Sequence, residues 1–235
     1  MANYLIVGAT SGIGLAVTQQ LLDEGQTVFG VGRNLQALTE LQKKYPRLFT
    51  MKYDIQSLQS QTVIAAAHEK MGSIDVFFLN SGVASGHSMT DWLDAAPTVQ
   101  TNVMGTTEVL INAFAYLKKD SRGGSIAVNT SVAGIRGLRQ APVYSASKAY
   151  LISLCQSLRS KIKNSSDKIH IIDIRPGFID TPLAGGTFWM SSKEKAARQI
   201  IRAIENKKEI AYISRRWVLV ATLMRLVPRA LYERV

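Results

Sequence analysis

The segment Tyr4-Leu5-Ile6-Val7-Gly8-Ala9-Thr10-Ser11-Gly12-Ile13-Gly14 joins a short apolar run to a glycine-rich turn, and a helical pattern begins directly after it. The unbroken apolar run predicts a strand that is buried on both faces. Glycine permits a tight turn and lets the backbone approach a pyrophosphate, and the first N–H groups of the following helix attract the anion. The spacing Gly-x-x-x-Gly-x-Gly therefore predicts a dinucleotide-binding turn, although a plain strand–helix turn is the alternative when the glycines are taken alone. No Gly-Lys-Ser/Thr follows, which excludes a P-loop nucleotidase.

The same alternation of strand and helix continues along the chain. Further strands are predicted over residues 27–31, 48–53, 74–80, 125–130 and 169–174, and helical spacing of apolar residues occurs over 13–24, 34–44, 57–71, 97–118 and 142–163. Repeated strand–helix–strand units with right-handed crossovers give an α/β fold, a single Rossmann-type doubly wound parallel sheet with helices on both faces. The 235 residues contain no linker or repeat, so we expect one catalytic and dinucleotide-binding domain over 1–213, followed by a tail over 214–235.

Composition excludes several other classes of protein. Apolar residues make up 46% and charged residues 19% of the chain, which excludes a disordered or fibrous protein. The single cysteine, Cys155, cannot form an internal disulfide and is expected in the core. The three histidines are too far apart along the sequence to suggest a metal site with it. The N-terminus has no signal-peptide pattern and no apolar run reaches the ~18 residues of a membrane span, so we expect a cytoplasmic protein.

The positive charge is concentrated at one end of the chain. Lysine and arginine number 28 against 17 acidic residues, and residues 193–235 hold 11 of the bases and 4 of the acids, or +7 of the net +11. A nucleic-acid-binding protein is therefore an alternative, but the sequence lacks a recognition-helix signature and basic strands rich in aromatic residues. We expect no nucleic-acid partner.

Arg33 follows the second predicted strand in Val31-Gly32-Arg33-Asn34. An acidic residue near this point would bind the ribose 2′-hydroxyl of NAD, whereas an arginine can pair with the 2′-phosphate of NADP. Because Gly32 puts no acid there, the sequence favours NADP(H) over NAD(H). A solvated loop arginine is the alternative.

Tyr144 and Lys148 lie four residues apart on a predicted helix and therefore on one face of it. A cation beside a phenol favours the phenolate, so this pair is suited to exchange a proton with an alcohol or a carbonyl. Ser131 follows the strand predicted over 125–130, at the edge where open α/β sheets bind ligands, and its hydroxyl could hold the substrate oxygen. Without these neighbours, Ser131 would be interpreted as a turn residue.

These motifs stand in the order found in short-chain dehydrogenases/reductases, and the chain resembles that family from residue 3 to about residue 213. The matching residues are Gly8, Gly12 and Gly14; Asn80-Ser81-Gly82; Asn102; Ser131; Tyr144 and Lys148; and Pro176-Gly177 with Thr181. The resemblance implies hydride transfer between NADP(H) and a small-molecule substrate, a carbonyl or secondary alcohol. It also implies a homodimer formed through helices 97–118 and 142–163.

The resemblance implies a role for each matching residue. Tyr144 would be the general acid for carbonyl reduction and the base for alcohol oxidation, Lys148 would lower the tyrosine pKa and hold the nicotinamide ribose, and Ser131 would orient the carbonyl. Asn102 would keep a water in a proton relay behind Lys148. The other cofactor-binding residues would be Gly8, Thr10, Ser11, Gly12, Ile13 and Gly14 at the pyrophosphate, Arg33 at the 2′-phosphate, Asp54 and Ile55 at the adenine, Asn80 and Gly82 along the cofactor, and Pro176, Gly177 and Thr181 at the nicotinamide end. The alternative function is a non-catalytic dinucleotide-binding regulator, which would not need the proton relay.

Two positions depart from the family pattern. Val7 stands where the family usually has threonine before the first glycine, and Leu79-Asn80-Ser81-Gly82 stands in place of Asn-Asn-Ala-Gly. Both Val7 and Leu79 replace a polar residue on strands that the resemblance places side by side. We therefore expect the two changes to compensate each other in packing.

Two segments near the C-terminus are not explained by the motifs. In the family, residues 182–192 cover the substrate; here Gly185-Gly186 could act as a hinge, and Phe188-Trp189-Met190 could form an apolar wall for an apolar substrate or pack on the core. In the tail, the apolar run Trp217–Met224 is flanked by arginines at 215, 216, 225, 229 and 234. A helix that is apolar all round must be buried, so we expect the domain, a dimer partner or an anionic membrane surface to cover it.

Overall fold

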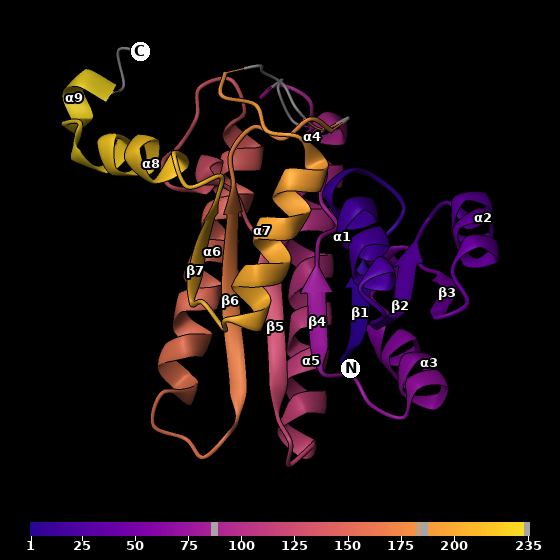
Figure 1. Cartoon of the computed structure of the whole chain (residues 1–235). Helices are drawn as coiled ribbons and strands as arrows, with labels where there is room; N and C mark the ends of the chain where they lie inside the picture. Colours follow the sequence, from indigo (N-terminus) through magenta and orange to yellow (C-terminus); the bar gives the residue numbers. More distant parts are fainter. Residues whose placement is uncertain (86–88, 182, 184–187, 233–235) are drawn as a thin grey trace.

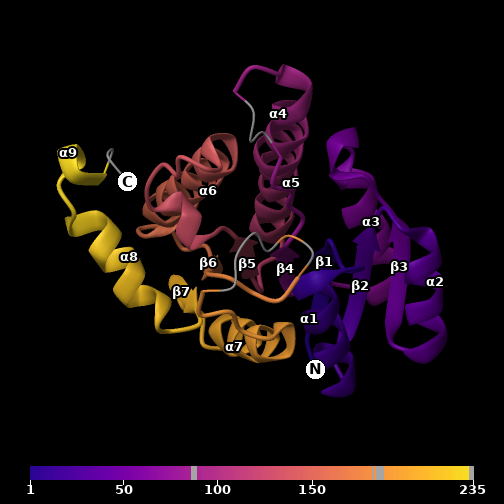
Figure 2. The same cartoon turned by 90° about the horizontal axis from the view of Figure 1, so that it is seen from above.

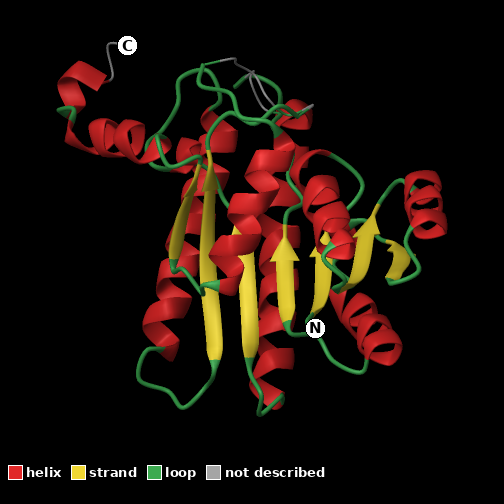
Figure 3. Cartoon of the chain, in the orientation of Figure 1, coloured by secondary structure: helices red, strands yellow, loops and turns green. Residues whose placement is uncertain are grey.

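In the computed structural model, which describes residues 1–85, 89–181, 183 and 188–232, seven parallel strands form one sheet in the order β3-β2-β1-β4-β5-β6-β7 (Figures 1 and 3). The strands are β1 (Asn3–Val7), β2 (Thr27–Gly32), β3 (Leu48–Lys52), β4 (Val76–Leu79), β5 (Gly124–Asn129), β6 (Ile169–Pro176) and β7 (Ile210–Ile213). The order reverses between β1 and β4, and the carboxyl ends of these strands form the edge at which open α/β sheets bind ligands. The predicted doubly wound sheet is confirmed.

Helices cover both faces of the sheet (Figure 2). They are α1 (Gly12–Asp23), α2 (Leu35–Lys44), α3 (Ser60–Met71), α4 (Trp92–Thr98), α5 (Thr106–Lys119), α6 (Pro142–Ile162), α7 (Lys193–Glu205), α8 (Trp217–Leu226) and α9 (Arg229–Tyr232). One buried cluster joins Phe78 to α1 and α7, and the other joins Phe77 to α3, α5 and α6. Since neighbouring strand residues face opposite ways, a sheet with two covered faces requires strands without polar alternation.

The edge strand β7 is missing from the prediction made from the sequence. Its four residues pair with β6 in parallel register, Ile174 opposite Ala211 and Pro176 opposite Ile213. Because the strand is short and Ile210 is exposed at the rim of the sheet, its sequence lacks the long apolar run by which the other strands are identified.

The single helix predicted over residues 97–118 is wrong. Helix α4 begins earlier, at Trp92, where the carboxylate of Asp91 accepts a hydrogen bond from the N–H of Leu93 at 2.8 Å. A π-helical turn over Val99–Gly105 then separates α4 from α5. A π-turn in an α-helix inserts a residue, and such turns are frequent at functional sites; this one contains Asn102.

Helix α8 packs against the rest of the chain with only one of its faces. Trp217 and Ala221 are buried, whereas Leu219 is 68% and Leu223 is 64% exposed. The expected burial of the apolar run is therefore not achieved within one chain. In the part of the chain that the structure describes, no helix has the length and apolar character to cross a membrane.

Candidate active site

The glycine-rich turn after β1 is held by close backbone contacts. Gly8 and Gly12 have φ angles of 92° and 52°, which a side chain would strain. A Cβ atom at Gly14 would overlap the carbonyl oxygen of Gly8, so only glycine lets α1 start this close to the turn. The amide of Asn80 at the end of β4 donates to that same Gly8 oxygen at 3.1 Å and ties the turn to the neighbouring strand.

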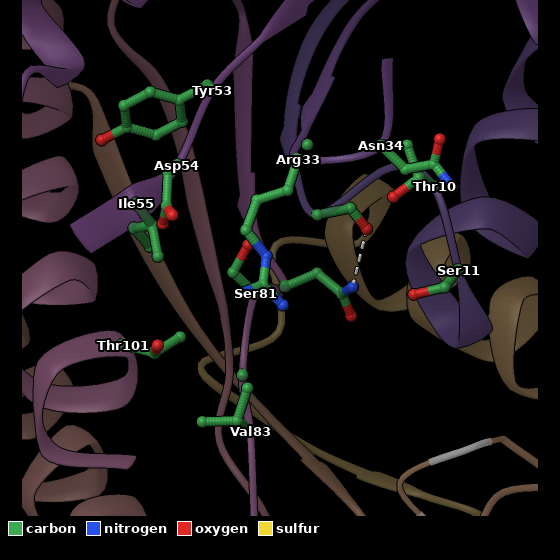
Figure 4. A pocket seen from close by; sticks show the side chains of 14 residues that line it. Thr10, Ser11, Arg33, Asn34, Tyr53, Asp54, Ile55, Ser81, Val83 and Thr101 are labelled. Atoms are coloured by element: carbon green, nitrogen blue, oxygen red, sulfur yellow. Dashed lines mark hydrogen bonds between the residues drawn. The ribbon is translucent and has the colours of Figure 1, made fainter. Parts of the chain in front are cut away.

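A cavity of about 370 Å³ lies over this turn (Figure 4). Thr10 and Ser11 line one side of it, Tyr53, Asp54 and Ile55 line the other, and Arg33 and Ser81 lie between them. Predicted cofactor-binding residues in its lining are Gly8, Thr10, Ser11, Arg33, Asp54, Ile55, Asn80 and Gly82. Lining residues that the sequence analysis misses are Gly32, Asn34, Tyr53, Ser81, Val83 and Thr101. Each of these residues stands next to a predicted site residue in the sequence, and this adjacency is the signal by which they could have been predicted.

The end of β2 is packed against the glycine-rich turn. A Cβ atom at Gly32 would lie 3.0 Å from the Thr10 hydroxyl oxygen, so a side chain at this position would press on Thr10. Arg33 is exposed and its side chain extends into the cavity (Figure 4). Asp54 lies across from it and caps the 3-10 helix Ile55–Ser57, accepting from the N–H of Gln56 at 3.0 Å.

Ser131 and Tyr144 meet at the carboxyl end of β5. Ser131 is buried and caps the 3-10 helix Val132–Gly134, accepting from the N–H of Ala133 at 3.1 Å. Its hydroxyl also lies 3.4 Å from the carbonyl oxygen of Pro176 at the end of β6. Burial raises the pKa of the Tyr144 phenol, and a hydrogen bond with Ser131 lowers it in part. At neutral pH the phenol is therefore protonated and can act as an acid.

Lys148 lies one turn after Tyr144 on α6, with its ammonium 5.7 Å from the centre of the tyrosine ring. The ammonium donates to the carbonyl oxygen of Asn129 at 2.8 Å. Burial lowers the pKa of Lys148 to about 8. The side chain is 3% exposed and no carboxylate among the described residues pairs with it, so its positive charge remains available to the tyrosine.

Asn102 is fully buried in the π-turn and fixes the segment after β4. Its side-chain oxygen accepts from the N–H of Val83 at 2.9 Å, and its amide donates to the Val83 carbonyl and to Ser147, at 2.9 and 3.0 Å. A Cβ atom at Gly82 would lie 3.4 Å from both the Asn102 oxygen and the Lys148 nitrogen. Both side chains therefore lie next to Gly82.

The residues expected at the nicotinamide end lie beyond the cavity lining. Gly12 faces Thr181, since a Cβ atom at Gly12 would lie 3.2 Å from the Thr181 methyl carbon. Pro176 is the last residue of β6, and Gly177 lies under the indole of Trp217. Ile13 and Gly14 lie in the first turn of α1 and are not part of the cavity lining. The Gly185-Gly186 hinge lies outside the described residues.

Asn129, the last residue of β5, contributes to the site and is absent from the prediction. Its carbonyl binds Lys148, and its side-chain amide donates to Asn80 at 2.8 Å. One residue thus joins the end of β4 to the helix that carries Tyr144. Its position directly before Thr130-Ser131, at the carboxyl end of a strand, is the signal that could have identified it.

The two departures from the family pattern are adjacent in the sheet. Val7 pairs with Leu79 in the register of β1 and β4, and both side chains are 2% exposed in the same core cluster. The two side chains therefore form a buried apolar pair at the ends of β1 and β4. Cys155 lies in that cluster too, as expected, and burial raises its pKa to about 12.

The residues around the turn fit a dinucleotide. The side chain of Ser11 makes no capping bond to α1, which leaves the first N–H groups of the helix for an anion. The turn is free of side chains at the three glycines, and a cation, Arg33, extends into the cavity between its two sides. This donor set suits the pyrophosphate of a dinucleotide.

Comparison with known proteins agrees with this geometry. The family model described as short chain dehydrogenase matches residues 2–191. An uncharacterized oxidoreductase of Staphylococcus epidermidis is 29% identical over 205 residues, covering 85% of this chain and 87% of that protein. A farnesol dehydrogenase of Aedes aegypti is 29% identical over 196 residues, covering 76% and 78%. The crystal structure of a short-chain dehydrogenase/reductase from Burkholderia phymatum in complex with NAD superimposes with a TM-score of 0.87 at 19% identity, covering 94% of this chain and 92% of that one.

Proposed function

The chain belongs to the short-chain dehydrogenase family, and from this premise we propose that it transfers a hydride between NADP(H) and a carbonyl or secondary alcohol, with Tyr144 as general acid and base. One observation carries the proposal. The Ser131 hydroxyl partly lowers the pKa of the Tyr144 phenol, and the buried ammonium of Lys148 lies on the same face of the helix as Tyr144. A regulator that only bound a dinucleotide would have no use for this arrangement.

Each of these side chains has a separate task in carbonyl reduction. Ser131 orients the substrate oxygen, and the protonated phenol of Tyr144 donates its proton to that oxygen as negative charge develops there. The ammonium of Lys148 stabilises the phenolate that remains. When bound, the nicotinamide supplies the hydride. Asn102 holds Val83 and Ser147 in place, and so supports the segment that surrounds Lys148.

The preference for NADP(H) rests on the end of β2. Gly32 packs against Thr10, and Arg33 extends into the cavity where the 2′-phosphate of the adenosine would lie. An arginine binds a phosphate through two parallel hydrogen bonds, which the 2′-hydroxyl of NAD cannot match. We therefore expect Arg33→Ala to weaken NADPH binding more than NADH binding.

We further propose a homodimer through α5 and α6. Ile111 on α5 is 58% exposed and Tyr150 on α6 is 40% exposed, and their helices stand together on one face (Figure 2). Tyr150 and Thr107 are hydrogen-bonded at 3.0 Å across the two helices, which presents one continuous surface. Sedimentation velocity of the full chain tests this, and a monomer would contradict it.

The uncovered leucines of α8 form a second surface, for which we propose a protein interface rather than an anionic membrane. Among the arginines that would face a membrane, Arg216 is already bound to the carbonyl of Trp189. Flotation with vesicles rich in anionic lipid distinguishes the two. Vesicle binding that is lost in Leu223→Asp would favour the membrane.

The substitution Tyr144→Phe tests the catalytic proposal. It removes the proton donor while the ring keeps its packing, so we expect carbonyl reduction with NADPH to be lost and NADPH binding to remain. Normal turnover by this variant would show that another group donates the proton.

A further inference from the structure

Helix α8 begins just after β7, near the carboxyl end of that strand, and extends outward beyond the β7 edge of the sheet, on the side away from α2 (Figures 1 and 2). Each end of this helix binds a loop that begins next to Ser131. We call residues 214–232, which contain α8 and α9, the C-terminal strap.

The beginning of the strap holds the segment that follows β6. The guanidinium of Arg216 donates to the carbonyl oxygens of Trp189 and Met190, at 2.5 and 3.1 Å, and lies 5.6 Å from the centre of the Trp189 ring. The ring of Trp217 meets the rings of Phe178, Phe188 and Trp189 edge-on, with centroid distances of 5.6, 6.1 and 6.5 Å. Trp217 is the only buried member of the Phe188, Trp189 and Trp217 group and serves as its base.

The far end of the strap holds the loop that follows β5. Arg136 donates to the carbonyl oxygens of Met224 and Val227 at 2.7 and 2.5 Å, and so satisfies the last carbonyls of α8. The same guanidinium lies 4.2 Å from the centre of the Tyr232 ring, and the Tyr232 hydroxyl donates to the carbonyl of Gly137 at 2.8 Å. Both contacts fix a loop that lies between Ser131 and Tyr144.

Both anchored loops lead directly to the reacting groups. Ser131 caps the 3-10 helix that ends two residues before Arg136. On the other side, the Ser131 hydroxyl contacts the carbonyl of Pro176, and Gly177, the next residue, is packed against the Trp217 indole. The strap therefore bridges the two loops on either side of Ser131.

Phe188 and Trp189 form an apolar surface on the anchored segment. Their rings are stacked with a centroid distance of 4.8 Å and an interplanar angle of 17°, yet they remain 57% and 40% exposed. A stack that is held by Trp217 and Arg216 and keeps this much of its apolar surface exposed is suited to contact a flat apolar group.

We propose that the strap positions this stack for substrate selection: Arg216 and Trp217 are positioning residues, and the Phe188–Trp189 stack contacts the apolar body of a bulky carbonyl substrate. This inference rests on the proposed reductase function. To the proposed function it adds a substrate class, namely carbonyls attached to a flat apolar group. It also adds residues that select for this class without contacting the cofactor.

Steady-state kinetics with NADPH and two probes tests the selection. The probes are 9,10-phenanthrenequinone, which is flat and apolar, and 2,3-butanedione, which is small. In Arg216→Ala and Trp217→Ala we expect KM for phenanthrenequinone to rise about tenfold, with kcat, the KM for butanedione and the Kd for NADPH changed by less than about twofold. Trp217→Phe should retain the wild-type KM, because the indole nitrogen of Trp217 is buried without a hydrogen-bond partner and its loss removes no bond. Arg216→Lys should recover part of the loss.

The matched control is Arg215→Ala, which removes an exposed arginine next to Arg216 in the same turn. It should leave all constants unchanged. Equal effects of Arg215→Ala and Arg216→Ala, or a parallel change for both probes, would overturn the proposal.

Hydrogen exchange tests the strap without any substrate. The N–H groups of Asp180 and Ser191 bind the carbonyls of Ser191 and Phe178, at 2.9 and 3.0 Å, and so report on opening of the anchored segment. We expect both amides to exchange about tenfold faster in Arg216→Ala than in Arg215→Ala. Equal exchange would overturn the positioning role. A wild-type protein that reduces neither probe would instead count against the proposed function, and the exchange result would still decide whether the strap holds the segment.

Discussion

Replacing Lys148 by methionine should stabilise the fold at neutral pH while abolishing activity. Lys148 is 3% exposed, and burial lowers its pKa from 10.5 to about 8. Below pH 8 the folded protein must therefore keep a buried ammonium whose main contact is one carbonyl oxygen, that of Asn129. Methionine fills a similar volume and carries no charge.

The magnitude follows from proton linkage. Between pH 8 and 10.5 the unfolded chain binds more protons at this lysine than the folded chain, so the wild-type free energy of unfolding rises with pH across that window. A shift of this size opposes folding by about 3 kcal/mol at pH 7 and by about 1 kcal/mol at pH 9.5. The lost hydrogen bond to Asn129 subtracts the same amount at both pH values. The advantage of Lys148→Met over wild type should therefore be about 2 kcal/mol larger at pH 7 than at pH 9.5.

Urea denaturation of wild type and variant at the two pH values measures this difference. Groups common to both proteins cancel, which isolates the single lysine. Lys161→Met, which replaces an exposed lysine on the same helix, is the control and should show no such pH dependence. A stability difference for Lys148→Met that is the same at both pH values would show that burial does not destabilise the Lys148 ammonium.

Three further predictions concern the turn, the core and the acid. Gly14→Ala forces a methyl group into the Gly8 carbonyl and should lower the free energy of unfolding by about 2 kcal/mol in thermal melts, with weaker NADPH binding. In wild type the buried guanidinium of Arg175 donates to the Asp173 carboxylate at 2.8 Å, and Asp173→Asn removes this counter-charge. We expect the free energy of unfolding, measured with urea, to fall by about 3–5 kcal/mol. A loss as small as that from breaking an exposed ion pair would contradict this. Ser131→Ala removes the bond that lowers the Tyr144 pKa, so the alkaline limb of the reduction rate, where the phenol ionises, should move to higher pH.

Most of the fold could be predicted from the sequence because its signals are local. Five of the six predicted strands are largely apolar runs with buried residues on two faces, whereas in the edge strand β3 only Leu48 is buried. Gly8, Gly12 and Gly14 mark the turn after the first strand. The strand β7 was not predictable in this way, since it depends on the edge that β6 offers. The π-turn at Asn102 was hidden for a related reason: apolar spacing continues across it, and one inserted residue does not interrupt the pattern.

Those residues of the candidate site that act through their side chains could be predicted from the sequence. Tyr144, Lys148 and Ser131 lie together as their spacing indicated, and Arg33 lies in the cavity. Asn129 was missed because its backbone carbonyl, which every residue possesses, binds Lys148. The strap contacts were missed because Arg136 and Arg216 bind carbonyls far away in sequence, and no local pattern records such a partner.

Fluorescence titration of the full chain with NADPH and NADH, in parallel and with Arg33→Ala beside wild type, measures whether the chain binds NADP(H) through Arg33. We expect tight binding of NADPH, weaker binding of NADH, and a loss of that preference in Arg33→Ala. Equal binding of the two dinucleotides by wild type would contradict the role of Arg33. Binding of neither would contradict the assignment of the cavity over the glycine-rich turn to a nicotinamide dinucleotide, and with it the proposed reductase.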